Sequence, residues 1–334
     1  MIKKLVMNEP VLKTYPKHSN VTSILANHVN FEEWLYSNHI QLFCAIYENS
    51  TKYDTYLDIY EPLHRVYYPL LECKSIKKEI ISACSIDPSA FAISNIDEGY
   101  YVYACVDIFY IPEYQSNKHK NHDIFVFGYD DDEQTFFVAD FFKGHYSCQT
   151  ISFDCFSAAV NSTFRDENQF KDIQMLKTLD NPVHSVYCFD IDNVLIQLKD
   201  YLGEYNSSLR YREFEAPLPD TDNRTWGLGV YDSLISSISQ EKVPKVTRRS
   251  LHALYEHKKL MVGRVKYLLD NEYITEKKVL EKHKIIETKS LILRNIFMKS
   301  MARSFDKNPI VSKLKELQNM DNEALAELVY LLEC

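Results

Sequence analysis

Two aromatic-rich runs that flank an acidic turn constrain the fold more than any other part of the chain. They form the stretch NHDIFVFGYDDDEQTFFVADFFKG, residues 121–144. Aromatic and β-branched runs on both sides of a short polar segment are typical of a β-hairpin. We therefore expect two neighbouring antiparallel strands with a turn around Asp130–Glu133.

The residues around this hairpin predict more β structure, and the second half of the chain predicts helices. YYVYACVDIFYI (residues 100–111) predicts a long buried strand, and YSCQTISFDCFSAAV (146–160) a strand followed by a helix. Beyond Phe170, apolar residues recur at intervals of three and four, as on one face of a helix. The expected class is α+β, with a β-rich domain at residues 1–165 and a mainly α-helical region at 166–334 that packs on it.

Shorter segments give weaker predictions before residue 90. NVTSILANH (residues 20–28) predicts a helix for which Ser19 or Asn20 is the candidate cap. We expect a strand around Ile40–Tyr47 and a helix from about Ser75. The segment 213–239, EFEAPLPDTDNRTWGLGVYDSLISSIS, interrupts the helical series and is expected to form a loop.

Composition and missing motifs exclude several functional classes. The net charge of −9 argues against a nucleic-acid partner, because phosphate binding needs clustered Lys and Arg. The seven glycines form no phosphate-binding motif and no nucleophile elbow. The eight cysteines form no C-x-x-C pair, and H-E-x-x-H is absent, so we expect buried reduced thiols and neither a bound cofactor nor a metal. No apolar run is long enough for a membrane span or a signal peptide, which predicts a cytoplasmic protein.

His122 and Asp140 are the first candidates for chemistry. His122 opens the first strand of the expected hairpin and Asp140 closes the second, so the two side chains become neighbours if they share a face. A carboxylate on one ring nitrogen fixes the tautomer and leaves the other nitrogen as a base. The alternative is that both are solvated hairpin residues.

A nucleophile would complete a catalytic triad. In a papain-type arrangement it lies at the N-terminus of an early helix, where the helix dipole favours a thiolate and backbone N–H groups hold an oxyanion. The corresponding segment here is PKHSNVTSIL, whose candidates are Ser19, Thr22 and Ser23. Ser19 is also explained by helix capping alone, and Cys44, the nearest cysteine, by burial in a strand.

A cluster of basic residues lies in EHKKLMVGRVKYL, residues 256–268. Its members are His257, Lys258, Lys259, Arg264 and Lys266. The segment is either a solvated helix face or a docking surface for an acidic carrier domain or its phosphopantetheine arm.

The segment from Tyr101 to Val160 resembles the butirosin-type acyltransferase family, papain-like proteins of the cysteine-protease fold linked to non-ribosomal peptide and antibiotic biosynthesis. The shared features are a long strand that runs into D-x-[FY]-[YL]-[IL]-P, then H-x-x-x-V-x-G-Y-D, then V-x-D before a turn. YSNHIQLFC, TWGLGVYDSL and EHKKLMVGRVKYL add to the similarity, which spans roughly residues 15–334. The resemblance implies a papain-like N-terminal domain with an antiparallel sheet and an early helix that carries the nucleophile.

The resemblance also implies an activity. Members of the family use a cysteine, a histidine and an aspartate to transfer an acyl group from a carrier-protein phosphopantetheine thioester to an amine. His122 and Asp140 match the histidine and the aspartate, and the cysteine position falls within Ser19–Ser23, where this chain has SNVTS. The missing cysteine has three explanations: a lost nucleophile, a serine-based variant or a replaced cysteine.

The sequence therefore leaves three functions open. They are amide-forming acyl transfer, a catalytically silent protein that binds a peptide-like metabolite or carrier protein, and a peptidase. The expected partners are a carrier protein and an amine acceptor, and the sequence does not decide between a monomer and a homodimer.

Overall fold

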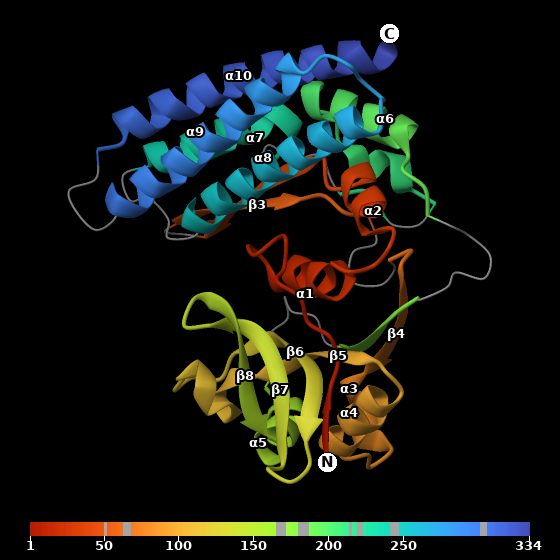
Figure 1. The fold of residues 1–334 in the computed structure, drawn as a ribbon. Helices are drawn as coiled ribbons and strands as arrows, with labels where there is room; N and C mark the ends of the chain where they lie inside the picture. The colour runs from red at the N-terminus through yellow and green to blue at the C-terminus, as the bar shows by residue number, and fades with distance from the viewer. Residues whose placement is uncertain are drawn as a thin grey trace. The chain divides into compact units, whose positions relative to one another are not determined.

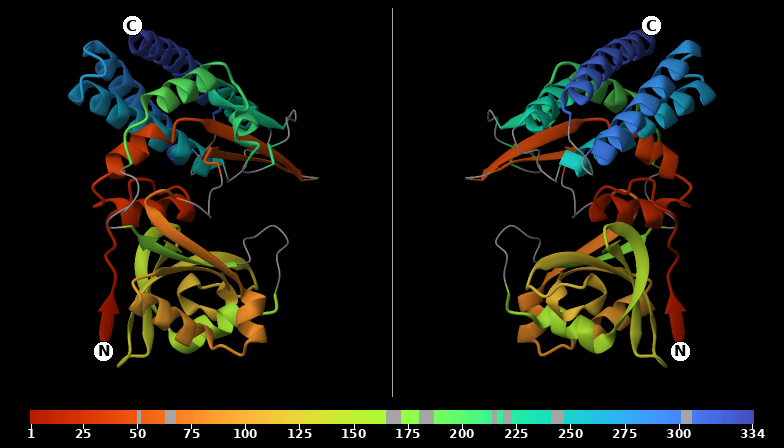
Figure 2. Two further views of the ribbon diagram at one scale, coloured as in Figure 1. Left: turned by 90° about the vertical axis from the view of Figure 1, so that its right-hand side faces the viewer. Right: turned by 90° about the vertical axis from the view of Figure 1, so that its left-hand side faces the viewer.

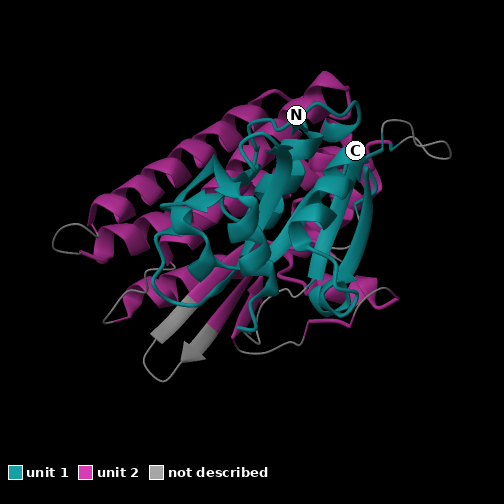
Figure 3. Ribbon diagram, turned by 90° about the horizontal axis from the view of Figure 1, so that it is seen from below, with its two compact units in different colours: residues 1–31, 64–187 teal, residues 32–63, 188–334 magenta. Residues whose placement is uncertain are grey.

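The computed structural model describes all residues except 50–51, 63–67, 165–171, 180–186, 214–215, 219–222, 241–246 and 301–305. The fold is α+β, with antiparallel sheets and a helical C-terminal part, as the sequence predicts. The chain divides into two compact units, which Figure 3 shows in different colours. Unit 1 contains residues 1–31 and 64–187, and unit 2 contains residues 32–63 and 188–334.

Unit 1 is built on an antiparallel sheet with the strand order β4-β9-β5-β6-β7-β8, with β1 paired to β6. Its strands are β1 (Ile2–Lys4), β4 (Leu71–Lys77), β5 (Tyr101–Asp107), β6 (Asn121–Asp130), β7 (Thr135–Phe142), β8 (His145–Ser152) and β9 (Asp172–Thr178). The predicted hairpin is β6–β7, in which Asp130 pairs with Thr135 and Val126 with Val138. The hairpin thus places the ends of these strands, where His122 and Asp140 lie, side by side.

Helices cover both faces of this sheet. They are α1 (Pro16–Leu25), α3 (Lys78–Ala83), α4 (Pro88–Asp97) and α5 (Phe153–Asn161). The main core lies on the α4 and α5 side, where Ala92, Ile96 and Phe156 pack against strand residues such as Val126 and Val138. Helix α1 lies on the other side of the sheet (Figures 1 and 2).

Unit 2 combines a small sheet, of order β10-β2-β3, with long helices. Its elements are α2 (Phe31–Ser37, which begins at the last residue of unit 1), β2 (Leu42–Asn49), β3 (Lys52–Ile59), α6 (Ile191–Leu202), β10 (Arg224–Trp226), α7 (Val230–Ser239), α8 (Thr247–Asp270), α9 (Lys278–Ser300) and α10 (Asn308–Glu333). Ser250 of α8 fixes β3 to that helix, because its Oγ donates to Thr55 O at 2.7 Å. Helix α8 therefore runs along the open edge of β3, and α7, α9 and α10 lie on one side of this sheet (Figure 1).

Several predicted elements differ from the structure. Ser75 lies in strand β4, not in a helix, and β9 adds a strand beyond Phe170. The long strand expected at 100–111 ends at Asp107, where a short 3-10 turn (Ile108–Tyr110) begins. The loop expected at 213–239 contains strand β10 and helix α7.

The predicted domain boundary at residues 165 and 166 lies outside the described residues. The two units divide the chain differently from that prediction, because residues 32–63 belong with the C-terminal part. The prediction of buried thiols holds for Cys44 and Cys105, whereas Cys84, Cys148, Cys188 and Cys334 are exposed. Across the described residues, no helix combines the length and apolarity needed to cross a membrane.

Candidate functional site

His122 and Asp140 are in direct contact at the ends of β6 and β7. His122 Nδ1 is 3.0 Å from Asp140 Oδ2 and 2.9 Å from the backbone oxygen of Asp123. Two acceptors at Nδ1 hold a proton on that nitrogen, so Nε2 carries the lone pair when the ring is neutral. The imidazole–carboxylate contact expected from the hairpin is therefore present, and the catalytic role of the pair stays a prediction.

Asp140 is shielded from water, whereas His122 is partly exposed to it. The Asp140 side chain is 1% exposed and the His122 side chain 28%. Burial lowers the pKa of His122, but the hydrogen bond and charge of Asp140, with help from Asp123, outweigh burial and raise the pKa to about 9. At neutral pH the pair is therefore an imidazolium–carboxylate ion pair.

A tyrosine from a neighbouring turn completes the cluster. The Tyr114 hydroxyl donates to Asp140 Oδ2, the same oxygen that faces His122. Asp140 Oδ1 is buried and has no hydrogen-bond partner among the described residues. The Tyr114 ring also lies against His122, with ring centroids 5.6 Å apart, and against Phe142 at 4.8 Å.

Strand alternation assigns the pair to one face of the sheet. His122 lies opposite Val106, and Asp140 is two residues beyond Val138, so both side chains project on the side of the α4–α5 core. Tyr146 lies opposite Phe141, one position from Asp140, and therefore projects on the other side. This difference decides which helix can approach the pair.

Ser19 is not brought to the pair. Its Oγ donates to the carbonyl of Tyr15 at 3.1 Å, and it forms no hydrogen bond with either His122 or Asp140. The next residue, Asn20, accepts the Tyr146 hydroxyl at 2.7 Å, so α1 meets the sheet from the face opposite to His122.

The predicted cap at Ser19 or Asn20 is wrong, because α1 begins at Pro16. Proline suits the first helical position, since its fixed φ matches the helix and it has no N–H to satisfy.

Of the other two candidates in the nucleophile segment, Thr22 is engaged in the same way, whereas the buried Ser23 hydroxyl has no hydrogen-bond partner among the described residues. Thr22 Oγ1 donates to His18 O at 2.8 Å. Burial raises the pKa of Tyr146, and the adjacent Ser23 hydroxyl acts in the opposite direction, which places Ser23 beside Tyr146. The N–H groups of His18 and Ser19 both donate to Tyr15 O, so they are not free for the expected oxyanion site at the helix N-terminus.

A second histidine–aspartate pair lies near the first, and the sequence patterns did not predict it. His119 Nδ1 is 2.7 Å from Asp107 Oδ2, and Ser162 Oγ donates to the same oxygen at 2.7 Å. Burial raises the pKa of Asp107, and these hydrogen bonds, with two from backbone N–H groups, outweigh it and lower the pKa. Ser162 donates to the Asp107 carboxylate and not to the His119 imidazole. A serine nucleophile would have to donate to the imidazole that acts as its base, so this cluster is not a Ser–His–Asp triad.

The basic cluster on α8 is mostly not a surface. His257, Lys258 and Arg264 are fully buried, which corrects the expectation of a docking face or a solvated one for these residues. Lys258 Nζ is 2.5 Å from Asp321 Oδ2 of α10, and Arg264 Nε donates to Tyr36 O at 2.8 Å. These side chains join the helices of unit 2, and only Lys259 and Lys266 of the predicted cluster remain exposed.

Lys266 borders a groove of about 1060 Å³ within unit 2, between the end of α8 and the start of α9. Leu269, Ile274 and Leu280 contribute its apolar lining. Lys266 pairs with Asp270 at 4.0 Å and Lys284 with Glu281 at 2.8 Å.

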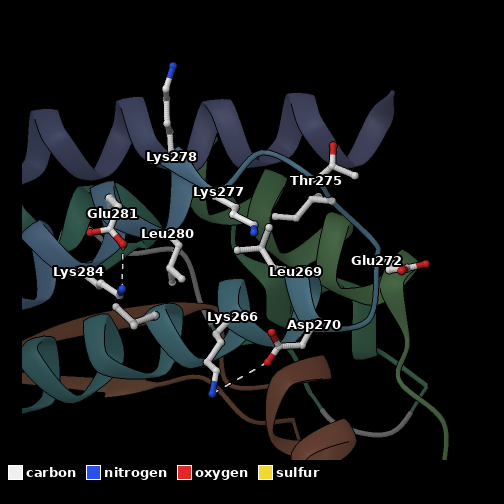
Figure 4. A pocket seen from close by; sticks show the side chains of 12 residues that line it. Lys266, Leu269, Asp270, Glu272, Thr275, Lys277, Lys278, Leu280, Glu281 and Lys284 are labelled. Atoms are coloured by element: carbon white, nitrogen blue, oxygen red, sulfur yellow. Dashed lines mark hydrogen bonds and ion pairs between the residues drawn. The ribbon is translucent and has the colours of Figure 1, made fainter.

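Two further lysines line the groove, and their side chains point in different directions. Lys277 points into the groove beside Leu269, and Lys278 points away from it (Figure 4). Neither ammonium group has an ion-pair partner among the described residues.

No protein-family model matches the chain, and no curated protein matches it at a significant level.

Proposed function

We propose that the protein transfers an acyl group from the phosphopantetheine thioester of a carrier protein to an amine, with His122 as the general base. The observation that carries the proposal is the 3.0 Å contact between His122 Nδ1 and Asp140 Oδ2, which orients the ring and leaves Nε2 for proton transfer. A papain-like arrangement, cytoplasmic location and role in natural-product biosynthesis belong to the same proposal through the motif resemblance.

In the simplest route the amine attacks the thioester carbonyl directly. In molecules whose His122 ring is neutral, Nε2 accepts the proton that the amine loses as the new C–N bond forms. The carbon–sulfur bond then breaks, and the imidazolium returns the proton to the leaving thiolate. Asp140 stabilises the imidazolium in between, as its contact with Nδ1 allows.

Ser19 defines a second route, through an acyl-serine intermediate. Its Oγ donates to Tyr15 O and makes no contact with His122, so this route requires a rearrangement of α1. An alcohol is also far less acidic than a thiol, which makes it a weaker nucleophile. We therefore favour the direct route over the serine route.

The test uses acetyl-pantetheine as donor and a panel of small amines as acceptors, with release of free thiol as the readout. We expect His122→Asn to lower turnover by about 10²- to 10⁴-fold, which is the usual contribution of a general base. His145→Asn is the matched control, because His145 is an exposed histidine of the same unit. Equal rates for wild type and His122→Asn would reject the role of His122.

Intact mass separates the two routes. An adduct of one acetyl group that is lost in Ser19→Ala establishes the serine route. Turnover that persists in Ser19→Ala without an adduct establishes the direct route.

One observation favours a second candidate function, a binding protein without catalysis. Ser19 and Thr22 at the nucleophile position are engaged in local hydrogen bonds, with Tyr15 and His18 respectively, and no hydroxyl of this segment bonds to His122. Binding of acetyl-pantetheine with no thiol release from the wild-type protein would select this candidate. Cleavage of a peptide panel by the wild-type protein, lost in His122→Asn, would instead select a peptidase.

A further inference from the structure

The turn that carries Tyr114 is closed at its base by Asp107. Asp107 Oδ1 accepts hydrogen bonds from the N–H groups of Phe109 and Lys120, at 3.1 and 3.2 Å. The N–H of Ile108 donates to Lys120 O at 3.0 Å. The first and last residues of the segment 108–120 are therefore tied together at the ends of β5 and β6.

The other carboxylate oxygen of Asp107 holds the same segment. It accepts from Ser162 Oγ and faces His119 Nδ1, both at 2.7 Å. The His119 ring stacks on Phe109 with centroids 4.2 Å apart. Because Asp107 is 0% exposed and bonded at both oxygens, it fixes the segment to the rigid sheet.

Within this segment the backbone directs Tyr114 toward Asp140. Pro112 opens a short 3-10 turn that ends at Tyr114, and Gln115 follows with a left-handed φ of 54°. The hydroxyl reaches Asp140 Oδ2, and the ring packs against Phe142. The contact joins two residues that are far apart in the sequence, and it depends on the closed segment.

We infer that Tyr114 is a positioning residue of the His122–Asp140 pair, and that the segment 108–120, closed by Asp107, delivers its hydroxyl to Asp140 Oδ2. The inference adds a residue to the site of the proposed function. Its readout is the protonation of His122, so it stands or falls independently of acyl transfer.

The electrostatic consequence follows from the shared oxygen. Asp140 Oδ2 accepts from Tyr114 and also faces the His122 imidazolium, and a hydrogen bond from a hydroxyl draws charge away from the carboxylate. Burial, and then the charge of Asp140, raise the pKa of Tyr114 well above its ordinary value, so the hydroxyl stays a donor at every working pH. The titratable groups that face His122 are Asp140 on β7, Asp123 on β6 and Tyr114 itself.

Tyr114→Phe removes the hydroxyl and keeps the ring. Without the tyrosine hydroxyl, Asp140 Oδ2 accepts only from His122 and therefore stabilises the imidazolium more strongly. We expect the pKa of His122 to rise by about half a unit to one unit, a threefold to tenfold gain in proton affinity. Tyr110→Phe is the matched control, because Tyr110 lies in the same segment and is 37% exposed. We expect it to leave the pKa of His122 unchanged.

The measurement is an NMR titration of the histidine Cε1–H signals, with the His122 signal assigned by its loss in His122→Gln. An unchanged or lowered pKa in a folded Tyr114→Phe protein overturns the inference. If Tyr114→Phe does not fold, Tyr114→3-fluorotyrosine decides. Its more acidic hydroxyl donates a stronger hydrogen bond, so the pKa of His122 should fall, and an unchanged value overturns the inference.

Discussion

The ion pair between His122 and Asp140 makes a quantitative prediction about stability. The pKa of His122 rises from an ordinary 6.5 to about 9 in the folded protein. At about 1.4 kcal/mol for each unit of pKa, this rise corresponds to about 3 kcal/mol of stabilisation of the folded state. Because the His122 side chain is 28% exposed, solvent screens part of it, and we expect about 2 to 3 kcal/mol.

The upward direction of the pKa shift of His122 determines the pH range over which the ion pair stabilises the fold. A group whose pKa is raised on folding contributes its full stabilisation below its unfolded pKa, here about 6.5. The contribution disappears as the pH rises through the folded value of about 9. The gap in unfolding free energy between the wild type and His122→Gln should therefore be largest near pH 6 and shrink by about 2 to 3 kcal/mol by pH 10.

Urea unfolding from pH 6 to pH 10 measures this gap. The signal should be far-UV circular dichroism or tyrosine fluorescence, since Trp34 and Trp226 both lie in unit 2 and do not report on unit 1. His145→Gln controls for the loss of an exposed histidine and should show a gap that does not vary with pH in this way. A constant gap for His122→Gln would refute the argument that Asp140 holds the imidazolium in the folded state.

Three further predictions concern activity, partner binding and the core of unit 2. Thiol release by the wild-type protein should rise with pH up to about pH 9, as His122 loses its proton and becomes a base, and a flat pH–rate profile would contradict its role. If a carrier protein docks at the α8–α9 groove, Lys277→Glu should weaken binding of a phosphopantetheine-loaded acidic carrier domain by about fivefold in calorimetry. Lys278→Glu is the control and should leave binding unchanged, because Lys278 points away from the groove. Equal effects of the two variants would exclude the groove as the docking site. Asp321→Asn leaves Lys258 buried without its charge partner and should lower the unfolding free energy by about 3 to 5 kcal/mol in urea denaturation. The double variant Lys258→Met/Asp321→Leu removes both charges and should lose less unfolding free energy than Asp321→Asn. A larger loss in the double variant would contradict this reasoning.

Local patterns predicted the part of the site that lies on the hairpin. The aromatic runs around Asp130–Glu133 set the register of β6 and β7, and that register brings His122 to Asp140. Tyr114 was not predictable in the same way. It lies in a polar segment without periodicity, and its position depends on the hydrogen bonds of Asp107, which join residues that no local pattern relates.

Non-local pairing also explains the missed strands. The segment LECKSIK has local features of a helix start, but it forms β4 because Lys74 pairs with Met175 of β9. On α8 the sequence did contain a usable signal. His257, Lys258 and Arg264 share a helical stripe with Leu254, Met261 and Val265, a spacing that predicts burial more directly than their charge predicts exposure.

The way the chain alternates between the two units has a consequence for its synthesis. Strands β2 and β3 emerge early from the ribosome, but their third strand, at Arg224–Trp226, and the helix that anchors Thr55 through Ser250 emerge much later. Until then Cys44 and Leu57, both fully buried in the finished protein, have no covering layer. The nascent chain must keep this hairpin from aggregating while unit 1 folds, and any fragment that stops near residue 165 inherits the same uncovered surface.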